Sequence, residues 1–153
     1  MKPPPTLEEK LKQNIFDLGN YFIMEMPADP DFLYHEGVAM QHCLEYCHVE
    51  YAERMKDGSQ RQFSLVDKQT GQPCVDIELS IKRSSYSGQV ERPVVTQIRG
   101  IRNQCPPDDR YLPIILAFLQ REDFDFVNHG IRNFDGRCDG DKVFDRWLEL
   151  CCE

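Results

Sequence analysis

The sequence predicts an α+β fold, with a small antiparallel sheet of three to four strands packed by a long central helix and by terminal helices. Two observations carry this prediction. Apolar residues recur at spacings of three and four between residues 31 and 56, which is typical of one face of a helix. Apolar and polar residues alternate strictly over 75–81, which is typical of a strand with one buried face.

The first element is predicted to be a short helix behind a proline leader. Thr6 and Glu9 have the spacing of a capping box, in which each side chain accepts a hydrogen bond from the backbone of the other residue. The apolar positions that follow recur at helical spacing and are Leu7, Leu11, Ile15 and Leu18. We expect this helix to end at Gly19 and the apolar segment 21–26 to be extended.

A long central helix is predicted to begin near Asp31 or Glu36 and to run to Lys56, where Asp57-Gly58 ends it. Its apolar stripe is expected to face the core. The stripe consists of Met40, Cys43, Leu44, Cys47, Tyr51 and Met55.

Three strands are predicted at 62–67, 75–81 and 94–101, the first two joined by a hairpin turn at 68–72. In the second strand, Asp76 and Glu78 lie on the face opposite the apolar residues, so one sheet face is expected to be buried and the other polar. If the strands pair as an antiparallel meander, Glu78 lies near Gln97 and Arg99 of the third strand.

Two helices are predicted in the last third of the chain. Pro106 and Pro107 precede a helix led by Asp108 or Asp109, with Leu112, Ile115, Leu116 and Leu119 as its apolar face. A short strand or turn at 126–134 and a glycine-rich loop at 135–141 then lead to a terminal helix that carries Trp147. The chain has no internal repeat, so we expect residues 1–153 to form a single α+β domain.

Composition restricts the partners and the compartment. With 18 basic and 26 acidic residues the net charge is -8, which disfavours direct binding to nucleic acid. Seven cysteines at irregular spacing favour reduced thiols. No apolar run approaches the roughly 18 residues that span a membrane, and the N-terminus lacks the apolar core of a cleaved signal. We expect a cytoplasmic protein, including one delivered into a host cell without a cleaved signal.

Several motifs together resemble the PcfJ-like family of conjugative plasmids, phages and bacterial genomes. They are Glu36-Gly37, Met40 to Cys43, Tyr51 to Arg54 with Gly58, Ser64-Leu65, Pro73 to Glu78, and Gln97 to Gly100 with Asn103. The resemblance implies a PcfJ-like core at about 36–121 and a C-terminal extension at 122–153. Two departures are the eight-residue step from Cys43 to Tyr51, where the family has four, and Asp76 in place of the family's threonine. The biochemical function of the family is unsettled.

The candidate catalytic residues are those of a thiol enzyme: Cys43, His42, Glu78, Gln97 and Asn103. A helix N-terminus lowers the pKa of a thiol, and an amide side chain donates to an oxyanion. Adjacent residues point about 100° apart on a helix, so His42 is poorly placed to be the base for Cys43, and His35, His48 or His129 would have to be brought in. The alternative is that Cys43 is a core cysteine and that His42 bonds the sheet, for example at Gln97 or Asn103.

Other side chains are candidate binding groups. Asp76, Glu78, Gln97 and Arg99 form either a polar face that binds a ligand or performs acid–base chemistry, or a solvated or helix-covered face with a cross-strand pair between Glu78 and Arg99. Arg99 and Arg102 belong to the one basic patch that would support nucleic-acid processing. Trp147 either docks a partner or closes the core. Zinc is disfavoured because His42 and His48 point away from Cys43 and Cys47 and no second close cysteine pair occurs before Cys151-Cys152. The sequence predicts no metal and no cofactor.

The leading functional hypothesis is a protein-binding accessory or effector module of mobile-element, phage or secreted origin that acts in the cytosol. It rests on the incomplete catalytic set, the acidic charge and the associations of the resembling family. The alternative is a cysteine-dependent amide hydrolase, deamidase or transferase that uses Cys43. A histidine or carboxylate close to the Cys43 sulfur in an accessible cleft would favour the alternative.

Overall fold

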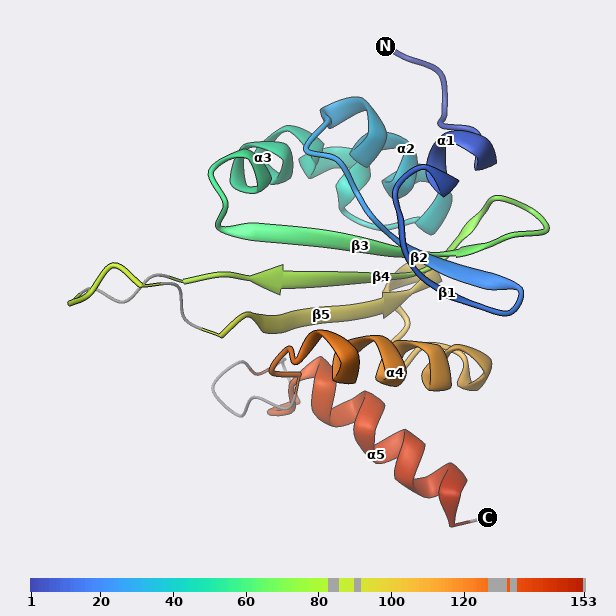
Figure 1. Cartoon of the computed structure of the whole chain (residues 1–153), viewed down its shortest axis with the longest axis vertical. Helices are drawn as coiled ribbons and strands as arrows, with labels where there is room; N and C mark the ends of the chain where they lie inside the picture. Colours follow the sequence, from blue (N-terminus) through green and yellow to red (C-terminus); the bar gives the residue numbers. More distant parts are fainter. Residues whose placement is uncertain (83–85, 90–91, 127–131, 133–134, 153) are drawn as a thin grey trace.

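The computed structural model describes residues 1–82, 86–89, 92–126, 132 and 135–152, and it has three layers (Figure 1). A five-stranded antiparallel sheet in the order β1-β2-β3-β4-β5 forms the middle layer. Its strands are β1 (Asn14–Leu18), β2 (Tyr21–Glu25), β3 (Gln60–Asp67), β4 (Pro73–Ser80) and β5 (Val94–Gly100). The predicted α+β class is confirmed, but the sheet has five strands where three to four were expected.

Helices cover both faces of this sheet. On one face lie α1 (Leu7–Leu11), α2 (Pro30–Met40) and α3 (Leu44–Lys56), and on the other lie α4 (Leu112–Glu122) and α5 (Asp139–Cys151) (Figure 1). No helix in the described ranges is long and apolar enough to cross a lipid bilayer.

The N-terminal helix is shorter than predicted. The capping box of Thr6 and Glu9 is present, but α1 ends at Leu11 and the chain turns into strand β1. Gly19 has a φ of +65° and, with Asn20, makes a two-residue turn between the paired residues Leu18 and Tyr21. The apolar residues Ile15 and Leu18 therefore belong to a β-hairpin, where pairing with β2 outweighs their helical spacing.

The single central helix of the prediction is wrong, because two helices cross there. Helix α2 ends at Gln41, which has a left-handed backbone with a φ of 56°, and α3 begins after Cys43. Gly37 lets the helices approach: a Cβ atom at this position would lie 2.0 Å from the backbone nitrogen of Glu45. Met40 and Leu44 of the predicted stripe are buried, whereas Cys43 is exposed.

The predicted meander is confirmed, and so are the hairpin between β3 and β4 and the pairing of Glu78 with Gln97 in register. The apolar face of the sheet packs on α4, with Phe63, Leu65, Ile77, Ile98, Ile115 and Phe118 fully buried. A second core, with Phe22, Met24, Leu33 and Leu44, lies under α2 and α3. Asp76 and Glu78 are only 6% and 7% exposed on this second face, so the face expected to be polar is covered by helices.

The last helix is attached to the edge of the sheet by a buried carboxylate. Asp139, the first residue of α5, accepts the backbone N–H of Ile98 at 2.9 Å and pairs with both Nε and Nη2 of Arg99 at 2.7 and 3.1 Å. Helices α4 and α5 lie where the sequence predicts them. The strand or turn expected at 126–134 falls largely outside the described residues.

Candidate functional site

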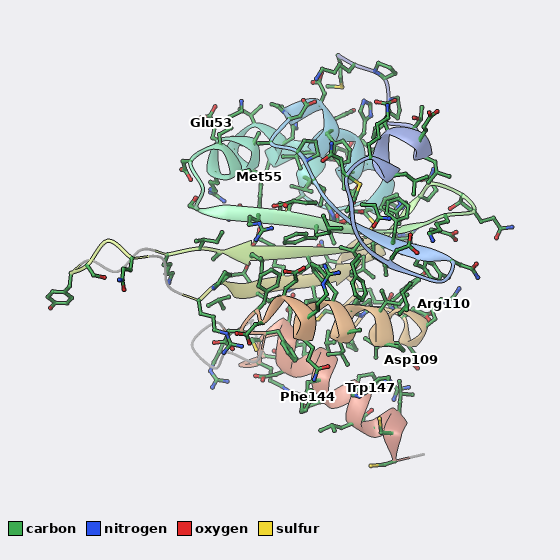
Figure 2. All side chains as sticks on the ribbon, viewed as in Figure 1. Glu53, Met55, Asp109, Arg110, Phe144 and Trp147 are labelled. Carbon is green, nitrogen blue, oxygen red and sulfur yellow. The ribbon has the colours of Figure 1, made fainter. Side chains whose placement is uncertain are left out.

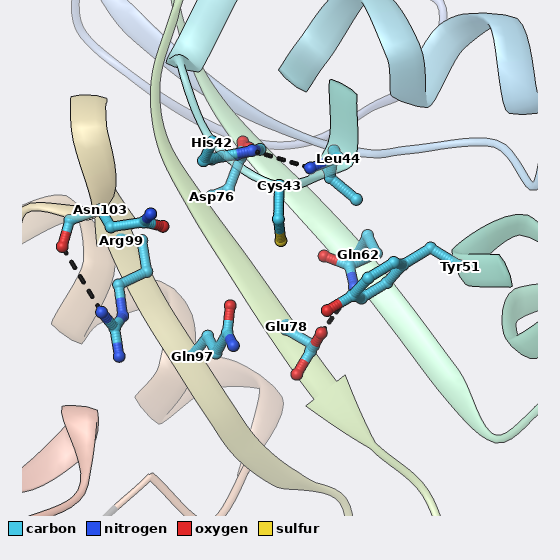
Figure 3. Close-up of a pocket in the computed structure, with 10 residues that line it drawn as sticks. All are labelled: His42, Cys43, Leu44, Tyr51, Gln62, Asp76, Glu78, Gln97, Arg99 and Asn103. Carbon is cyan, nitrogen blue, oxygen red and sulfur yellow. Dashed lines mark hydrogen bonds and ion pairs between the residues drawn. The ribbon is translucent and has the colours of Figure 1, made fainter. Parts of the chain in front are cut away.

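A narrow pocket lies between the α2–α3 junction and strands β3, β4 and β5 (Figure 3). Its empty volume is about 320 Å³, including the open mouth. It is lined by His42, Cys43, Leu44, Tyr51, Gln62, Asp76, Glu78, Gln97, Arg99 and Asn103. The structure therefore brings together all five candidate catalytic residues, together with Asp76 and Arg99. Arg102 and Trp147 are not among the lining residues.

Glu78 forms a fixed acidic group inside the pocket. Gln62 donates its amide Nε2 to Glu78 Oε1 at 3.1 Å, and the Thr96 hydroxyl donates to Oε2. Both oxygens accept hydrogen bonds, which is the pattern of an ionised carboxylate. Among the described residues Glu78 forms no ion pair, and Arg99, the one cationic residue in the lining, is paired with Asp139. The predicted cross-strand pair between Glu78 and Arg99 is therefore wrong.

Cys43 and Tyr51 line the pocket beside Glu78. The residue Cys43 is exposed, but its sulfur points into the pocket that Tyr51 also lines (Figure 3). Burial, followed by the charges of Cys47 and Glu78, raises the pKa of the Cys43 thiol. Burial and the Glu78 carboxylate also raise the pKa of Tyr51. Both groups are therefore neutral hydrogen-bonding groups at neutral pH, and Cys43 lacks the lowered pKa of an activated nucleophile.

His42 is turned away from Cys43 and toward the sheet. Its Nε2 lies 2.5 Å from Asp76 Oδ2, and its Nδ1 accepts the backbone N–H of Leu44 at 3.4 Å. This arrangement requires a proton on Nε2 and a lone pair on Nδ1, which is the neutral imidazole. Burial lowers the pKa of His42 accordingly, against an opposing effect of Glu36. His42 is a structural histidine that bonds the sheet, although its partner is Asp76 and not Gln97 or Asn103.

The other histidines in the described part of the chain do not supply a base for Cys43. His35 bonds the backbone carbonyl of Lys2 at 2.8 Å, and His48 bonds that of Glu45 at 3.0 Å. Neither residue lines the pocket. His129 lies outside the described residues. Glu78 is thus the potential proton acceptor that the structure places beside Cys43.

The remaining predicted binding residues lie in different parts of the structure and do not form one site. Arg102 donates to Gln41 Oε1 at 2.9 Å, and Arg99 is held by Asp139, so these two arginines do not line a common basic groove. Trp147 lies on α5, on the other side of the sheet, where it packs half-buried against the core beneath α4 (Figure 2). Together with Phe144 it also lines a separate hollow between α4 and α5.

Sequence reasoning missed several residues that position the site. Gln62 faces Glu78 in the register of the β3–β4 hairpin, so the turn at 68–72 contained the signal that could have found it. Thr96 reaches Glu78 next to a register shift between β4 and β5, which no sequence pattern indicates. Glu36 and Asp139 are buried carboxylates in helices, and their partners come from distant strands. Among the described residues no group of three or more His, Cys, Asp or Glu side chains is arranged to hold a metal ion.

Comparison with known proteins assigns no family. No family model matches the chain, and no curated protein matches it. The resemblance to the PcfJ-like family and its mobile-element associations therefore stay predictions.

Solved structures with a similar backbone include three that are described as acetyltransferases. A probable acetyltransferase is 10% identical, with a TM-score of 0.49 over 82% of this chain and 87% of that chain. A ribosomal-protein-alanine N-acetyltransferase from Brucella melitensis biovar Abortus 2308 is 8% identical, with a TM-score of 0.42 over 69% and 76%. A predicted acetyltransferase with acetyl-CoA from Clostridium acetobutylicum is 7% identical, with a TM-score of 0.42 over 82% and 88%. These similarities assign no activity to this chain.

Proposed function

We propose that this protein binds another protein by holding a primary amine of that partner, a lysine side chain or an N-terminus, in the pocket at Glu78. The observation that carries the proposal is the Glu78 carboxylate itself. It is 7% exposed, fixed by Gln62 and Thr96, and forms no ion pair with a described residue. A buried charge without a partner is costly, and a bound cation supplies the missing partner.

The neighbours of Glu78 favour an ammonium group over other ligands. The lining adds neutral acceptors, the Gln97 amide and the Tyr51 hydroxyl, and an ammonium group has three N–H donors to satisfy. The pocket is narrow, which suits an unbranched chain better than a planar guanidinium. The net charge of -8 attracts a cationic partner and repels an anionic one.

Nuclear magnetic resonance titration of the ¹⁵N-labelled protein with two short peptides tests this proposal. Both peptides are blocked at their termini and contain one lysine, which is free in the first and Nε-acetylated in the second. We expect the free amine alone to shift the backbone signals of Tyr51, Gln62 and Gln97. Shifts of equal size with the acetylated peptide, or no shift with either, would overturn the proposal.

Two variants assign the effect to the pocket. Glu78→Gln removes the charge but keeps a hydrogen-bonding side chain, and we expect it to lose most of the response to the free amine. Glu53→Gln makes the same change of charge on the exposed face of α3 and should keep the response (Figure 2). A response retained by Glu78→Gln would contradict the role given to this carboxylate.

A second candidate function is a cysteine-dependent amide hydrolase, deamidase or transferase. It is favoured by one observation, that the Glu78 carboxylate and the Cys43 sulfur share the same open pocket. In this scheme Glu78 accepts the thiol proton when the sulfur attacks a carbonyl carbon, and the Gln97 or Asn103 amide donates to the oxyanion. The raised pKa of Cys43 opposes the scheme.

The rate of alkylation of each cysteine by iodoacetamide against pH separates the two functions, with the modified sites identified by peptide mass spectrometry. For the binding function we expect Cys43 to react with an apparent pKa above the value of about 8.5 for a free thiol. Selective reaction of Cys43 with an apparent pKa well below that value would favour the enzyme.

A further inference from the structure

Behind the pocket lies a second group of buried polar side chains that the proposed function does not use. Glu36 of α2, Ser64 of β3 and Asp76 of β4 are 3%, 0% and 6% exposed. Glu36 and Asp76 are close enough to shift each other's pKa, and Asp76 Oδ2 also lies 2.5 Å from His42 Nε2. These contacts form a chain from α2 through the sheet to the residue that precedes Cys43.

The carboxyl groups of Glu36 and Asp76 can hydrogen-bond to each other only with one additional proton. When both carboxyl groups are ionised, Glu36 Oε2 and Asp76 Oδ1 are buried atoms without a hydrogen-bond partner among the described residues. Two adjacent buried carboxylates repel each other, so one of them holds a proton. A proton on Glu36 lets Glu36 donate to one Asp76 oxygen while His42 donates to the other. Both unsatisfied atoms then find a partner.

The charged groups around the pair are few. Lys10 of α1 is the cation that faces it, although its Nζ also donates to the Gly71 carbonyl at 2.8 Å. The α2–α3 junction contributes the neutral His42, and strand β3 contributes the hydroxyl of Ser64. Strand β4 contributes Asp76 to the pair and, farther along, Glu78 to the pocket.

We infer that Glu36, Asp76 and His42 form a positioning chain with one shared proton, which holds the α2–α3 junction, and with it Cys43 and the wall of the pocket, against strand β4. The link to ligand binding rests on the function proposed above, but the chain itself can be tested without any ligand. The backbone of His42 is bonded to both helices, to Gly37 of α2 and to Glu45 of α3. The side-chain contact between His42 and Asp76 therefore ties this connection to the sheet.

The chain should weaken at both ends of the pH range. Burial, and next the Asp76 charge, raise the pKa of Glu36 well above its ordinary value. Its contribution to stability is therefore present at low pH and is lost as pH rises through the raised pKa. The pKa of His42 is lowered, so its contribution is present above about 6.5 and is lost as pH falls through the lowered value.

Replacing Glu36 by glutamine tests the shared proton. The amide of Glu36→Gln can donate a hydrogen bond to Asp76 at every pH. The wild-type Glu36 carboxyl group can donate only while it is protonated. We expect the Tm of the variant to rise relative to that of the wild type as pH increases from 6 to 9, by roughly 2–4 °C. Glu53→Gln should show no such trend. Equal pH dependence of the Tm in Glu36→Gln and wild type would overturn the inference.

Alkylation of Cys43 at pH 7 then tests the positioning role. Asp76→Ala removes the hydrogen bond to His42, and we expect Cys43 to react on the order of tenfold faster than in the wild type. In Asp76→Asn the amide oxygen still accepts from His42, so the alkylation rate should stay close to that of the wild type. If Asp76→Ala does not fold, the nuclear magnetic resonance signal of the His42 Nε2–H proton is measured in Asp76→Asn and Glu36→Gln instead. Loss of that signal in Glu36→Gln, or an unchanged rate in a folded Asp76→Ala, would contradict the role. If the amine does not bind, the proposed function is wrong, but the results of these ligand-free experiments on the positioning chain are unaffected.

Discussion

Single residues in this protein matter most where a charge is buried. Asp139 has a fully buried side chain, yet it begins an otherwise amphipathic helix and would pass for an ordinary acidic residue near a helix N-terminus. Its two oxygens hold the Arg99 guanidinium and the backbone N–H of Ile98. This carboxylate therefore joins α5 to the edge of the sheet.

Removing the arginine of this pair should be costly. We expect Arg99→Ala to lower the free energy of unfolding by about 3–5 kcal/mol, because a buried carboxylate loses its guanidinium. Urea denaturation followed by circular dichroism measures the change. Arg110→Ala is the matched control, since Arg110 and its partner Asp108 are both exposed, and we expect a change below about 1 kcal/mol. Equal losses in the two variants would contradict this assignment.

At the scale of elements, the α2–α3 junction creates the site. The apolar spacing continues from α2 into α3 without interruption, so the pattern predicts one helix. The backbone nevertheless adopts a left-handed conformation at Gln41, which ends α2. The break places His42 toward the sheet and the Cys43 sulfur toward the pocket (Figure 3). A continuous helix would have kept Cys43 within the stripe on the core side.

The close crossing at Gly37 should tolerate no side chain. We expect Gly37→Ala to destabilise the protein by roughly 1–3 kcal/mol or more, because the new methyl group overlaps the backbone of Glu45 and pushes the helices apart. Chemical denaturation is the measurement, and alkylation of Cys43 should become faster as well. Val38→Ala, at the next position and 44% exposed, should change stability by about 0.5 kcal/mol at most. A stable Gly37→Ala variant would contradict the crossing geometry.

At the scale of the whole molecule, the sheet is covered on both faces and has two apolar cores. Phe118 of α4 is central to the larger core, where its ring contacts those of Phe16, Phe63 and Phe124. These partners come from β1, from β3 and from the segment after α4. The aromatic group thus joins parts of the chain that are far apart in sequence.

Truncation of this ring should affect the whole fold. We expect Phe118→Ala to cost about 3–5 kcal/mol, a large fraction of the stability of a domain this size, because the side chain is fully buried. A lowered Tm in calorimetry is the expected result. Phe144→Ala removes the same side chain at a site that is 38% exposed and should cost much less. Similar costs at the two positions would contradict the distinction between core and surface.

The sequence by itself determined most of the local structure. Alternation over 75–81 identified β4, the turn at 68–72 identified its hairpin partner, and the capping box identified the start of α1. The predicted strand pairing placed Glu78 opposite Gln97, and the chemistry of the side chains singled out His42, Cys43 and Asn103, which line the same pocket. These features are readable because they depend on residues close in sequence or on one register.

Only the tertiary structure decided what those residues do. Whether Asp76 faces water or lies beneath a helix depends on where α2 packs, and the partner of Arg99 depends on where α5 begins 40 residues later. The ionisation of Cys43, Glu36 and His42 is likewise set by burial and by neighbours from other elements. Burial and electrostatic interactions act through space, so no periodicity along the chain reports them.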